Sequence, residues 1–111
     1  MHELSITQSI VELVADHAKG QRVRRVTLEI GQCTGVMTDA IRFCFDLATE
    51  GTVLEGATLD IYEIEGRALC AACGKEFPRR TLSAPCPCGA FEFTRISGEE
   101  LRVKTYELAR A

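Results

Sequence analysis

The first part of the chain carries an apolar pattern with the period of a helix. Apolar side chains recur every three or four positions along one stripe, whose members are Ile6, Ile10, Leu13, Val14 and Ala18. Ser5 and Gln8 have the spacing of a capping box, in which each side chain bonds the backbone N–H of the other residue. Gly20 is a typical helix stop. The pattern therefore predicts a helix over residues 6–19, with the first four residues outside its start.

Alternating polar and apolar positions predict strands further along the chain. Residues 26–30 and residues 101–105 alternate as half-buried strands do. Residues 58–65 are also typical of a strand, but the apolar positions change phase, which indicates a bulge or two covered faces. Between the strands at residues 26–30 and 58–65, Thr38 and Asp39 suit the start of a second helix. Its apolar stripe consists of Ile41, Cys44, Phe45 and Ala48, and Gly51 closes it.

Periodicity is lost between residues 66 and 96. This segment holds four of the six cysteines and all three prolines. We therefore predict an α+β fold in which two helices pack on a small three-stranded sheet, with an inserted zinc-ribbon-like four-cysteine module. The expected domains are residues 1–65 plus 97–111, which form one α/β domain, and residues 66–96, which form a zinc-binding domain.

The spacing of the cysteines in this module indicates a metal site. Two residues separate Cys70 from Cys73, and one residue separates Cys86 from Cys88. Two such turns can supply a closed tetrahedral set of four thiolates, which is typical of structural zinc, while iron in a rubredoxin-like site is the chemical alternative. A metal would also stabilise a segment this short, because chains under about 40 residues usually need a disulfide, a bound metal or a partner chain to fold.

The other two cysteines lie outside the module. Cys44 falls on the apolar stripe of the second helix, and Cys33 lies in a turn beside small residues. Both are predicted to pack as small hydrophobic side chains and not to bind a metal.

Composition and charge exclude several classes of function. The 111 residues carry a net charge of -3, which disfavours general binding of nucleic acid. Neither a basic, apolar leader nor a long apolar run is present, so we expect a cytoplasmic protein without a membrane segment. Four cysteines leave no open position on a zinc ion, and no nucleophile–base pair stands out, so we do not expect an enzyme.

The chain begins MHELS, which sets an imidazole beside a free amine. The amine of Met1, the deprotonated amide of His2 and the imidazole of His2 can close consecutive chelate rings on one ion. Such a coplanar nitrogen set suits Ni(II) or Cu(II) better than zinc. The amide of Glu3 is a further donor, and its carboxylate a supporting partner. The plainer alternative is that His2 is an exposed terminal residue that binds no metal. His17, near the end of the first helix, is likewise interpreted as an ordinary side chain without a metal role.

Together these features resemble the HypA/HybF family of hydrogenase maturation proteins, which are nickel metallochaperones. The similarity runs from MHELS through "VRRVTLEIGQCTGV", "IRFCFDLATEGTVLEGATLDI" and the cysteine module to "ISGEELRVKTYEL". The resemblance implies that His2 binds nickel, with backbone donors from Met1, His2 and Glu3 and support from the Glu3 carboxylate. It also implies structural zinc on the four cysteines, a HypB-type GTPase partner and delivery of nickel to the hydrogenase large subunit, and a homodimer is a further expectation.

The sequence departs from this family at one point. The second cysteine pair of the family is commonly Cys-Pro-x-Cys, whereas Cys86-Pro87-Cys88 has one residue fewer. The geometry of the zinc site therefore has to be tested against the structure.

The alternative function is a zinc-ribbon module that binds nucleic acid or protein. Lys75, Arg79, Arg80 and Arg95 give the module local positive charge. The whole chain is acidic, however, and no aromatic ladder accompanies these bases. We interpret them as a solvated face or as a docking surface for a protein.

Overall fold

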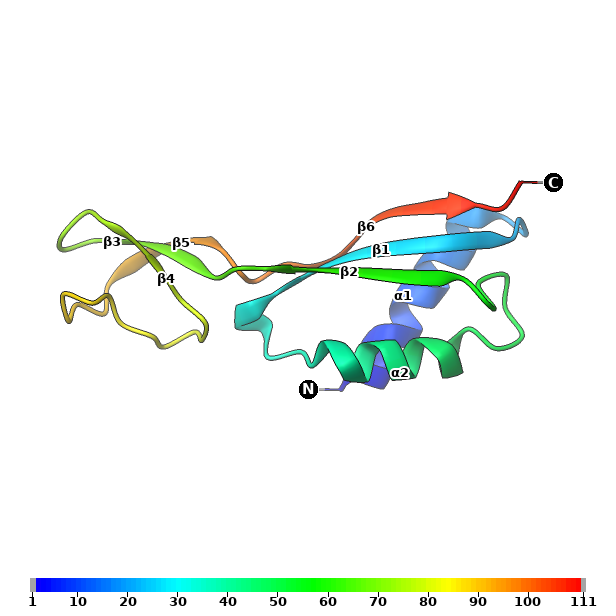
Figure 1. Cartoon of the computed structure of the whole chain (residues 1–111), viewed down its shortest axis with the longest axis horizontal. Helices are drawn as coiled ribbons and strands as arrows, with labels where there is room; N and C mark the ends of the chain where they lie inside the picture. Colours follow the sequence, from blue (N-terminus) through cyan, green and yellow to red (C-terminus); the bar gives the residue numbers. More distant parts are fainter. Residues whose placement is uncertain (1, 111) are drawn as a thin grey trace. The chain divides into compact units, whose positions relative to one another are not determined.

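The computed structural model describes residues 2–110, which form an α+β fold (Figure 1). Its elements are α1 (Glu3–Ala18), β1 (Val23–Gly31), the 3-10 helix η1 (Gln32–Thr34), α2 (Thr38–Ala48), β2 (Thr58–Ile64), β3 (Arg67–Cys70), β4 (Glu76–Pro78), β5 (Phe93–Ser97) and β6 (Leu101–Leu108). The strands form two three-stranded sheets, ordered β2-β1-β6 and β4-β3-β5. The predicted fold class, two helices on a three-stranded sheet with an inserted four-cysteine module, is confirmed.

The chain divides into two compact units. The first unit contains the described residues up to Leu28, Val36–Tyr62 and the residues from Arg102 onward. The second unit contains Glu29–Gly35 and Glu63–Leu101. The division of the chain into domains that the composition suggested stays a prediction.

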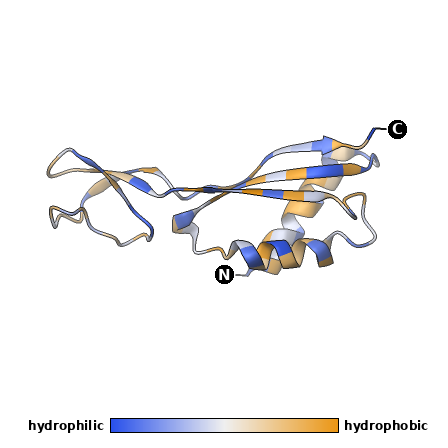
Figure 2. Cartoon of the chain, in the orientation of Figure 1, coloured by the Kyte–Doolittle hydropathy of each residue, from blue (hydrophilic) through white to orange (hydrophobic). Residues whose placement is uncertain are grey.

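The core of the first unit lies between its sheet and its helices, which lie on one side of the sheet (Figure 1). Figure 2 shows hydrophobic and hydrophilic residues alternating along β1. The buried apolar residues of this unit are Ile10, Val11, Val14 and Ala18 of α1, Val23, Val26 and Leu28 of β1, Ile41 and Phe45 of α2, and Leu54. Burial of each large side chain contributes roughly 1.5–3 kcal/mol, so this layer is the main source of stability of the first unit.

Helix α1 begins earlier than the sequence predicts. His2 is its N-cap residue, and the N–H of Ile6 donates to the carbonyl of His2 at 3.1 Å. The prediction of a capping box at Ser5 was therefore wrong, because Ser5 lies inside the first turn. Within the helix, the buried Thr7 hydroxyl donates to the carbonyl of Glu3 at 2.7 Å. The Glu3 carboxylate accepts the N–H of Met37 at the start of α2, so this tertiary contact also holds the first turn in place.

The remaining elements of the first unit follow the sequence pattern. The strands at 26–30, 58–65 and 101–105 correspond to β1, β2 and β6, and α2 begins at Thr38 as predicted. The phase change in β2 was explained either by a bulge or by two covered faces. The second explanation was wrong, because none of the residues of β2 is fully buried and neither of its faces is covered along its length. Its place at the edge of the sheet accounts for this exposure.

The second unit is built around β3, the central strand of its sheet. Strand β3 pairs antiparallel with β4 and with β5, and its pairing with β5 shifts register between Arg67 and Ala68. Its small core consists of Ala68, Cys70, Phe77 and Cys86, with Ala90 and Phe93 packed against it. The rings of Phe77 and Phe93 meet edge to face, with centroids 6.0 Å apart. Two of the four cysteines are therefore core residues of this unit.

Backbone segments of the second unit approach one another closely at two glycines. A Cβ atom on Gly31 would clash with the carbonyl of Gly98, and one on Gly66 would clash with the carbonyl of Arg79. Hydrogen bonds of 2.7 Å from the N–H of Arg79 to the carbonyl of Gly66 and from the N–H of Cys33 to the carbonyl of Gly98 hold these segments together. Glycine is required at both positions because no side chain fits between the backbones.

Candidate metal centres

The structure brings the four predicted zinc ligands together. Their Sγ atoms all lie within 4.8 Å of one another. The sulfurs of Cys70 and Cys88 are 3.7 Å apart, as are those of Cys73 and Cys86. A zinc–sulfur bond of about 2.3 Å in a regular tetrahedron places neighbouring sulfurs about 3.8 Å apart. The four-cysteine cluster therefore fits a structural zinc site, although its second pair has the shorter spacing.

A tighter turn accommodates the shorter second pair. In both turns the glycine that follows the second cysteine donates its N–H to the carbonyl of the first cysteine. Gly74 donates to Cys70 at 3.1 Å across four residues, whereas Gly89 donates to Cys86 at 2.8 Å across three. The missing residue therefore shortens the turn by one position and leaves its closing hydrogen bond in place.

Backbone N–H groups also point at the sulfurs. The N–H of Cys73 lies 3.4 Å from the Cys70 sulfur, and that of Cys88 lies 3.5 Å from the Cys86 sulfur. The N–H of Cys73 is the main reason that the pKa of Cys70 falls to about 6. The N–H of Cys88 acts in the same direction on Cys86, but burial and the neighbouring thiols outweigh it and raise its pKa to about 12. Four thiolates this close need a cation, because each negative sulfur opposes ionisation of the next.

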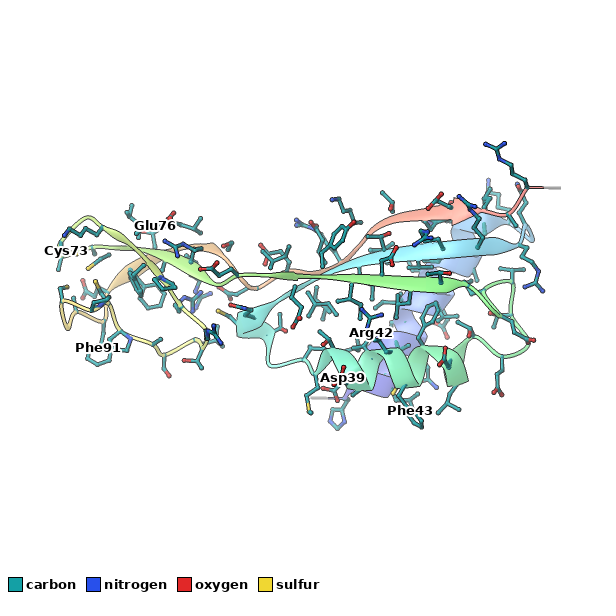
Figure 3. The ribbon with its side chains drawn as sticks, in the orientation of Figure 1. Asp39, Arg42, Phe43, Cys73, Glu76 and Phe91 are labelled. Atoms are coloured by element: carbon teal, nitrogen blue, oxygen red, sulfur yellow. The ribbon has the colours of Figure 1, made fainter. Side chains whose placement is uncertain are left out.

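The cluster has a buried half and an exposed half. Cys70 and Cys86 are 2% and 4% exposed, whereas Cys73 and Cys88 are exposed. Figure 3 shows Cys73 and Phe91 at the same end of the second unit. A pocket of about 320 Å³ borders the cluster, and its lining includes Cys73, Cys86 and Cys88. The zinc site is therefore anchored in the small core on one side and accessible on the other.

The two remaining cysteines lie outside this cluster. Cys33 is buried, as predicted for a small packed side chain, and its sulfur donates to the carbonyl of Arg79 at 3.0 Å. Cys44 is partly buried on α2. Packing therefore accounts for Cys33 without a metal.

Arg79 does not belong to a solvated basic face, and that part of the sequence interpretation was wrong. Its side chain is completely buried in the second unit. The guanidinium lies over the ring of Phe93, 4.8 Å from its centroid, and donates to a carboxylate oxygen of Glu99 at 3.1 Å. Arginine tolerates such a site because its flat, delocalised cation stacks on aromatic rings and pairs with carboxylates. Arg79 is therefore a core residue that the charge pattern alone did not reveal.

The second candidate centre is the start of α1. His2 is exposed and caps this helix. The first N–H groups of a helix have no acceptor within it, and the first intrahelical bond here comes from Ile6. The amides of His2 and Glu3 are therefore not committed to the helical ladder. The expected donor at the amine of Met1 lies outside the described residues. His17 is exposed near the end of α1, as its plainer interpretation predicted.

Glu3 joins this chain end to α2. Its carboxylate accepts the N–H of Met37 at 3.2 Å, and this hydrogen bond is the main reason that its pKa lies below the ordinary 4.5. Met37 is the N-cap residue of α2 and is 66% exposed. Sequence spacing could not identify this partner, because 34 residues separate the two positions.

A compact α+β unit combined with a four-thiolate module defines a small metal-binding protein. A family model described as "Hydrogenase/urease nickel incorporation, metallochaperone, hypA" matches residues 1–108. The chain therefore belongs to the HypA family, and its function is that of a nickel metallochaperone in hydrogenase maturation. The alternative function, a zinc-ribbon module that binds nucleic acid or protein, is not favoured.

Individual relatives agree with this assignment. The chain is 56% identical to "Hydrogenase maturation factor HypA" from Geobacter metallireducens, over 97% of this chain and 99% of the relative. It is 53% identical to a protein of the same name from Nostoc punctiforme, over 97% and 96%. The sequence similarity therefore covers both units of the fold.

Solved structures show the same fold. The solution structure of the Ni metallochaperone HypA from Helicobacter pylori matches with a TM-score of 0.67 and 24% identity, over 97% of each chain. A further solution structure of a HypA protein matches with a TM-score of 0.69 and 27% identity, over 98% of this chain and 97% of the other. Within residues 2–110, no helix has both the length and the apolar character that crossing a membrane requires.

Proposed function

We propose that this chain holds two metal ions in different ways. Zinc stays on Cys70, Cys73, Cys86 and Cys88, and nickel binds transiently at the chain start through His2. The sulfur–sulfur distances of 3.7 Å support the zinc assignment, because they match the edge of a zinc–thiolate tetrahedron. Four thiolates fill every position on the ion, so this zinc stabilises the fold and does not catalyse a reaction.

The single observation that best supports the nickel assignment is the position of His2 as the N-cap of α1. The amides of residues 2 and 3 have no intrahelical acceptor, so they can lose their protons to a metal without breaking the helical ladder. Together with the imidazole of His2 and the amine of Met1, they form a set of consecutive nitrogen donors. Nitrogen donors of this kind favour Ni(II) over Zn(II) when they are coplanar. The Glu3 carboxylate supports the site by fixing the first turn against α2.

The cargo passes to the hydrogenase maturation machinery. We propose a HypB-type GTPase as the partner in loading and the hydrogenase large subunit as the recipient, with a homodimer as a further assembly. These proposals rest on membership of the HypA family. They also imply a cytoplasmic protein without catalytic activity of its own, because a metallochaperone binds and transfers its ion without converting it chemically.

Nickel titration of the zinc-loaded chain tests the role of His2. We expect His2→Ala to weaken Ni(II) binding at least tenfold, measured by calorimetry, while the zinc content stays at one ion per chain. His17→Ala is the matched control, because it removes the other histidine, which is also exposed on α1. Equal nickel affinity in the wild type and His2→Ala, or a larger loss in His17→Ala, would remove His2 from the site.

A further inference from the structure

We propose that the solvent-facing side of α2 docks an amphipathic helix of a partner protein, one whose apolar stripe is flanked by lysine or arginine side chains. This side of the helix, called the α2 surface below, consists of Met37, Asp39, Phe43, Asp46 and Leu47. The inference concerns the recognition of a protein, and it does not depend on the nickel assignment.

Two large apolar side chains of α2 face the solvent. Phe43 is 68% exposed and Leu47 is 52% exposed. They are four positions apart in the helix, so their side chains are neighbours on one face. Ile41 and Phe45 supply the buried side of the same helix, and Figure 3 shows Phe43 on the side that faces away from the sheet. The core therefore does not use Phe43 and Leu47, and a partner can cover them.

Met37 extends this surface to the beginning of α2. It is the N-cap residue of the helix, and its side chain is exposed. Methionine is flexible and polarisable, so it adapts to the shape of a bound partner. Its N–H donates to the carboxylate of Glu3. The α2 surface therefore begins beside the first turn of α1, and a partner docked there lies next to the start of the chain.

Exposed carboxylates border the apolar pair. Asp39 lies four positions before Phe43 and Asp46 lies three positions after it, so both are neighbours of its ring on the helix. Within residues 2–110, neither carboxylate takes part in an ion pair. Arg42, the only basic residue of α2, donates instead to the carbonyl of Leu59 in β2 at 2.9 Å. The α2 surface therefore combines apolar area with negative charge.

The position of Asp46 is unfavourable for the helix itself. It lies in the last turn of α2, where the free backbone carbonyls already carry partial negative charge. No basic residue occurs in that turn, and the exposed Glu50 follows shortly after the helix. Helix stability therefore does not account for the carboxylates at this end, whereas a positively charged partner would compensate them.

The chemistry of the α2 surface defines the partner that fits it. A helix carries apolar side chains three and four positions apart, the same spacing as Phe43 and Leu47. Long lysine or arginine side chains beside that stripe reach the flanking carboxylates, because their stems lie along apolar surface while their charges extend outward. A second copy of this chain fits less well, because it would bring the same carboxylates together.

Peptide titration followed by amide NMR tests the proposal on the full-length, zinc-loaded chain without nickel. The probe is a capped peptide of about 18 residues, long enough to form a helix, built from leucine at helical spacing, lysine and alanine. One control peptide has the same composition in an order without an apolar stripe, and another has glutamate in place of lysine. We expect only the probe to bind, with shifts concentrated in residues 37–50 and none in residues 63–101.

Matched variants assign the binding to the α2 surface. Phe43→Ser should weaken binding of the probe about tenfold or more, as expected for a central aromatic contact. Asp46→Lys should also weaken it, by several-fold, and should reduce its dependence on salt. Leu13→Ser and Asp16→Lys are the controls, because they change an exposed leucine and an exposed aspartate of α1 outside the surface. All four positions are exposed, so the dispersed spectrum should be retained.

Several results would overturn the proposal. Equal binding of the three peptides, shifts centred outside α2, or an equal loss in Leu13→Ser and Phe43→Ser would each remove α2 as the docking site. A dimer of the chain in analytical ultracentrifugation that Phe43→Ser abolishes would show that a second copy covers this face instead. Because the titration contains no nickel, its outcome is separate from the test of His2.

Discussion

The two candidate metal sites differ in how the chain brings their donors together. The sulfurs of the second unit come from two turns, and the close pairs are 13 and 18 residues apart in the sequence. The nitrogens at the chain start would come from consecutive residues, of which His2 is exposed and is the N-cap of α1. A site assembled by folding loses its ion only when that part of the fold opens. A site made of neighbouring residues can release its ion while the fold stays intact.

Removal of zinc should have the largest effect, and it tests whether the ion holds the second unit together. Binding of a structural zinc contributes an apparent free energy of about 10–16 kcal/mol in peptide models. We therefore expect a strong chelator at neutral pH to unfold the second unit and to leave the first unit folded. Amide NMR spectra would show loss of dispersed signals from residues 63–101 and retention of those from residues 36–62.

A matched substitution controls for nonspecific effects of losing a cysteine. Cys70→Ala should reproduce the effect of the chelator, whereas Cys44→Ala should keep the zinc and the spectrum of the second unit. Unchanged signals from residues 63–101 in a chain shown to be free of zinc would contradict the structural role of the ion.

Arg79 tests whether the second unit also depends on a buried charge. Arg79→Ala removes the pairing with Glu99 and the contact with Phe93. Removing one partner of a fully buried ion pair costs about 3–5 kcal/mol. Glu99 is 36% exposed, so we expect a smaller loss, about 2–3 kcal/mol, in chemical unfolding of the zinc-loaded chain.

Arg80→Ala is the control for this substitution, because Arg80 is the exposed neighbour of Arg79. Surface substitutions of this kind usually change stability by about 0.5 kcal/mol or less. An equal loss in both variants would show that the buried position of Arg79 has no special importance.

Blocking the amine at the chain start tests whether the nickel site is independent of the zinc site. Acetylation of the amine of Met1 removes one expected nickel donor without changing any side chain. We expect Ni(II) affinity to fall at least tenfold, which corresponds to about 1.4 kcal/mol, while zinc content and unfolding of the second unit stay the same. Calorimetry and metal analysis measure the two properties separately, and a fall in zinc content would contradict the independence of the sites.

Acid should weaken nickel binding for a related reason. Protons compete with the metal for nitrogen donors as the pH falls, because a donor must be deprotonated to bind the ion. Nickel affinity measured between neutral and mildly acidic pH should therefore decrease. An affinity that stays constant over this interval would be inconsistent with nitrogen donors.

The smallest expected effect concerns the contact between Glu3 and Met37. The N–H of Met37 lowers the pKa of Glu3, so the charged carboxylate stabilises the folded state above the ordinary value of 4.5. This contribution is lost as the pH falls through the lower pKa of the folded chain. The amide NMR signal of Met37 should therefore shift with a midpoint below 4.5, and the shift should disappear in Glu3→Gln. A midpoint at or above 4.5 would show that the hydrogen bond is absent in solution.

Much of the architecture was predictable because the signals were local. The apolar stripe of α1, the alternation in β1 and the start of α2 each depend on residues a few positions apart. The pairs at Cys70 and Cys86 were equally clear, and the structure places their sulfurs at distances suited to zinc. The ligand roles of these cysteines and of His2 remain predictions, since assignment requires the ions.

Other features were missed because their partners are distant in the sequence. Strand β4 has only three residues, too few for an alternating pattern to be visible. The capping box at Ser5 satisfied the local rule, yet the helix extends to residue 3, where the Glu3 carboxylate accepts the N–H of Met37 from 34 residues away. The sequence alone does not distinguish a buried arginine such as Arg79 from an exposed one.

The amino-acid sequence alone determined the order of the helices and strands of the first unit, the presence of a four-thiolate module and a chain start rich in nitrogen donors. These properties follow from spacing and side-chain chemistry within short segments. Only the tertiary structure decided which sulfurs face each other, which are exposed, and where Glu3 and Arg79 find their partners. Those contacts join residues that are far apart along the chain, and folding alone brings them within the few ångströms over which sulfur, carboxylate and guanidinium groups interact.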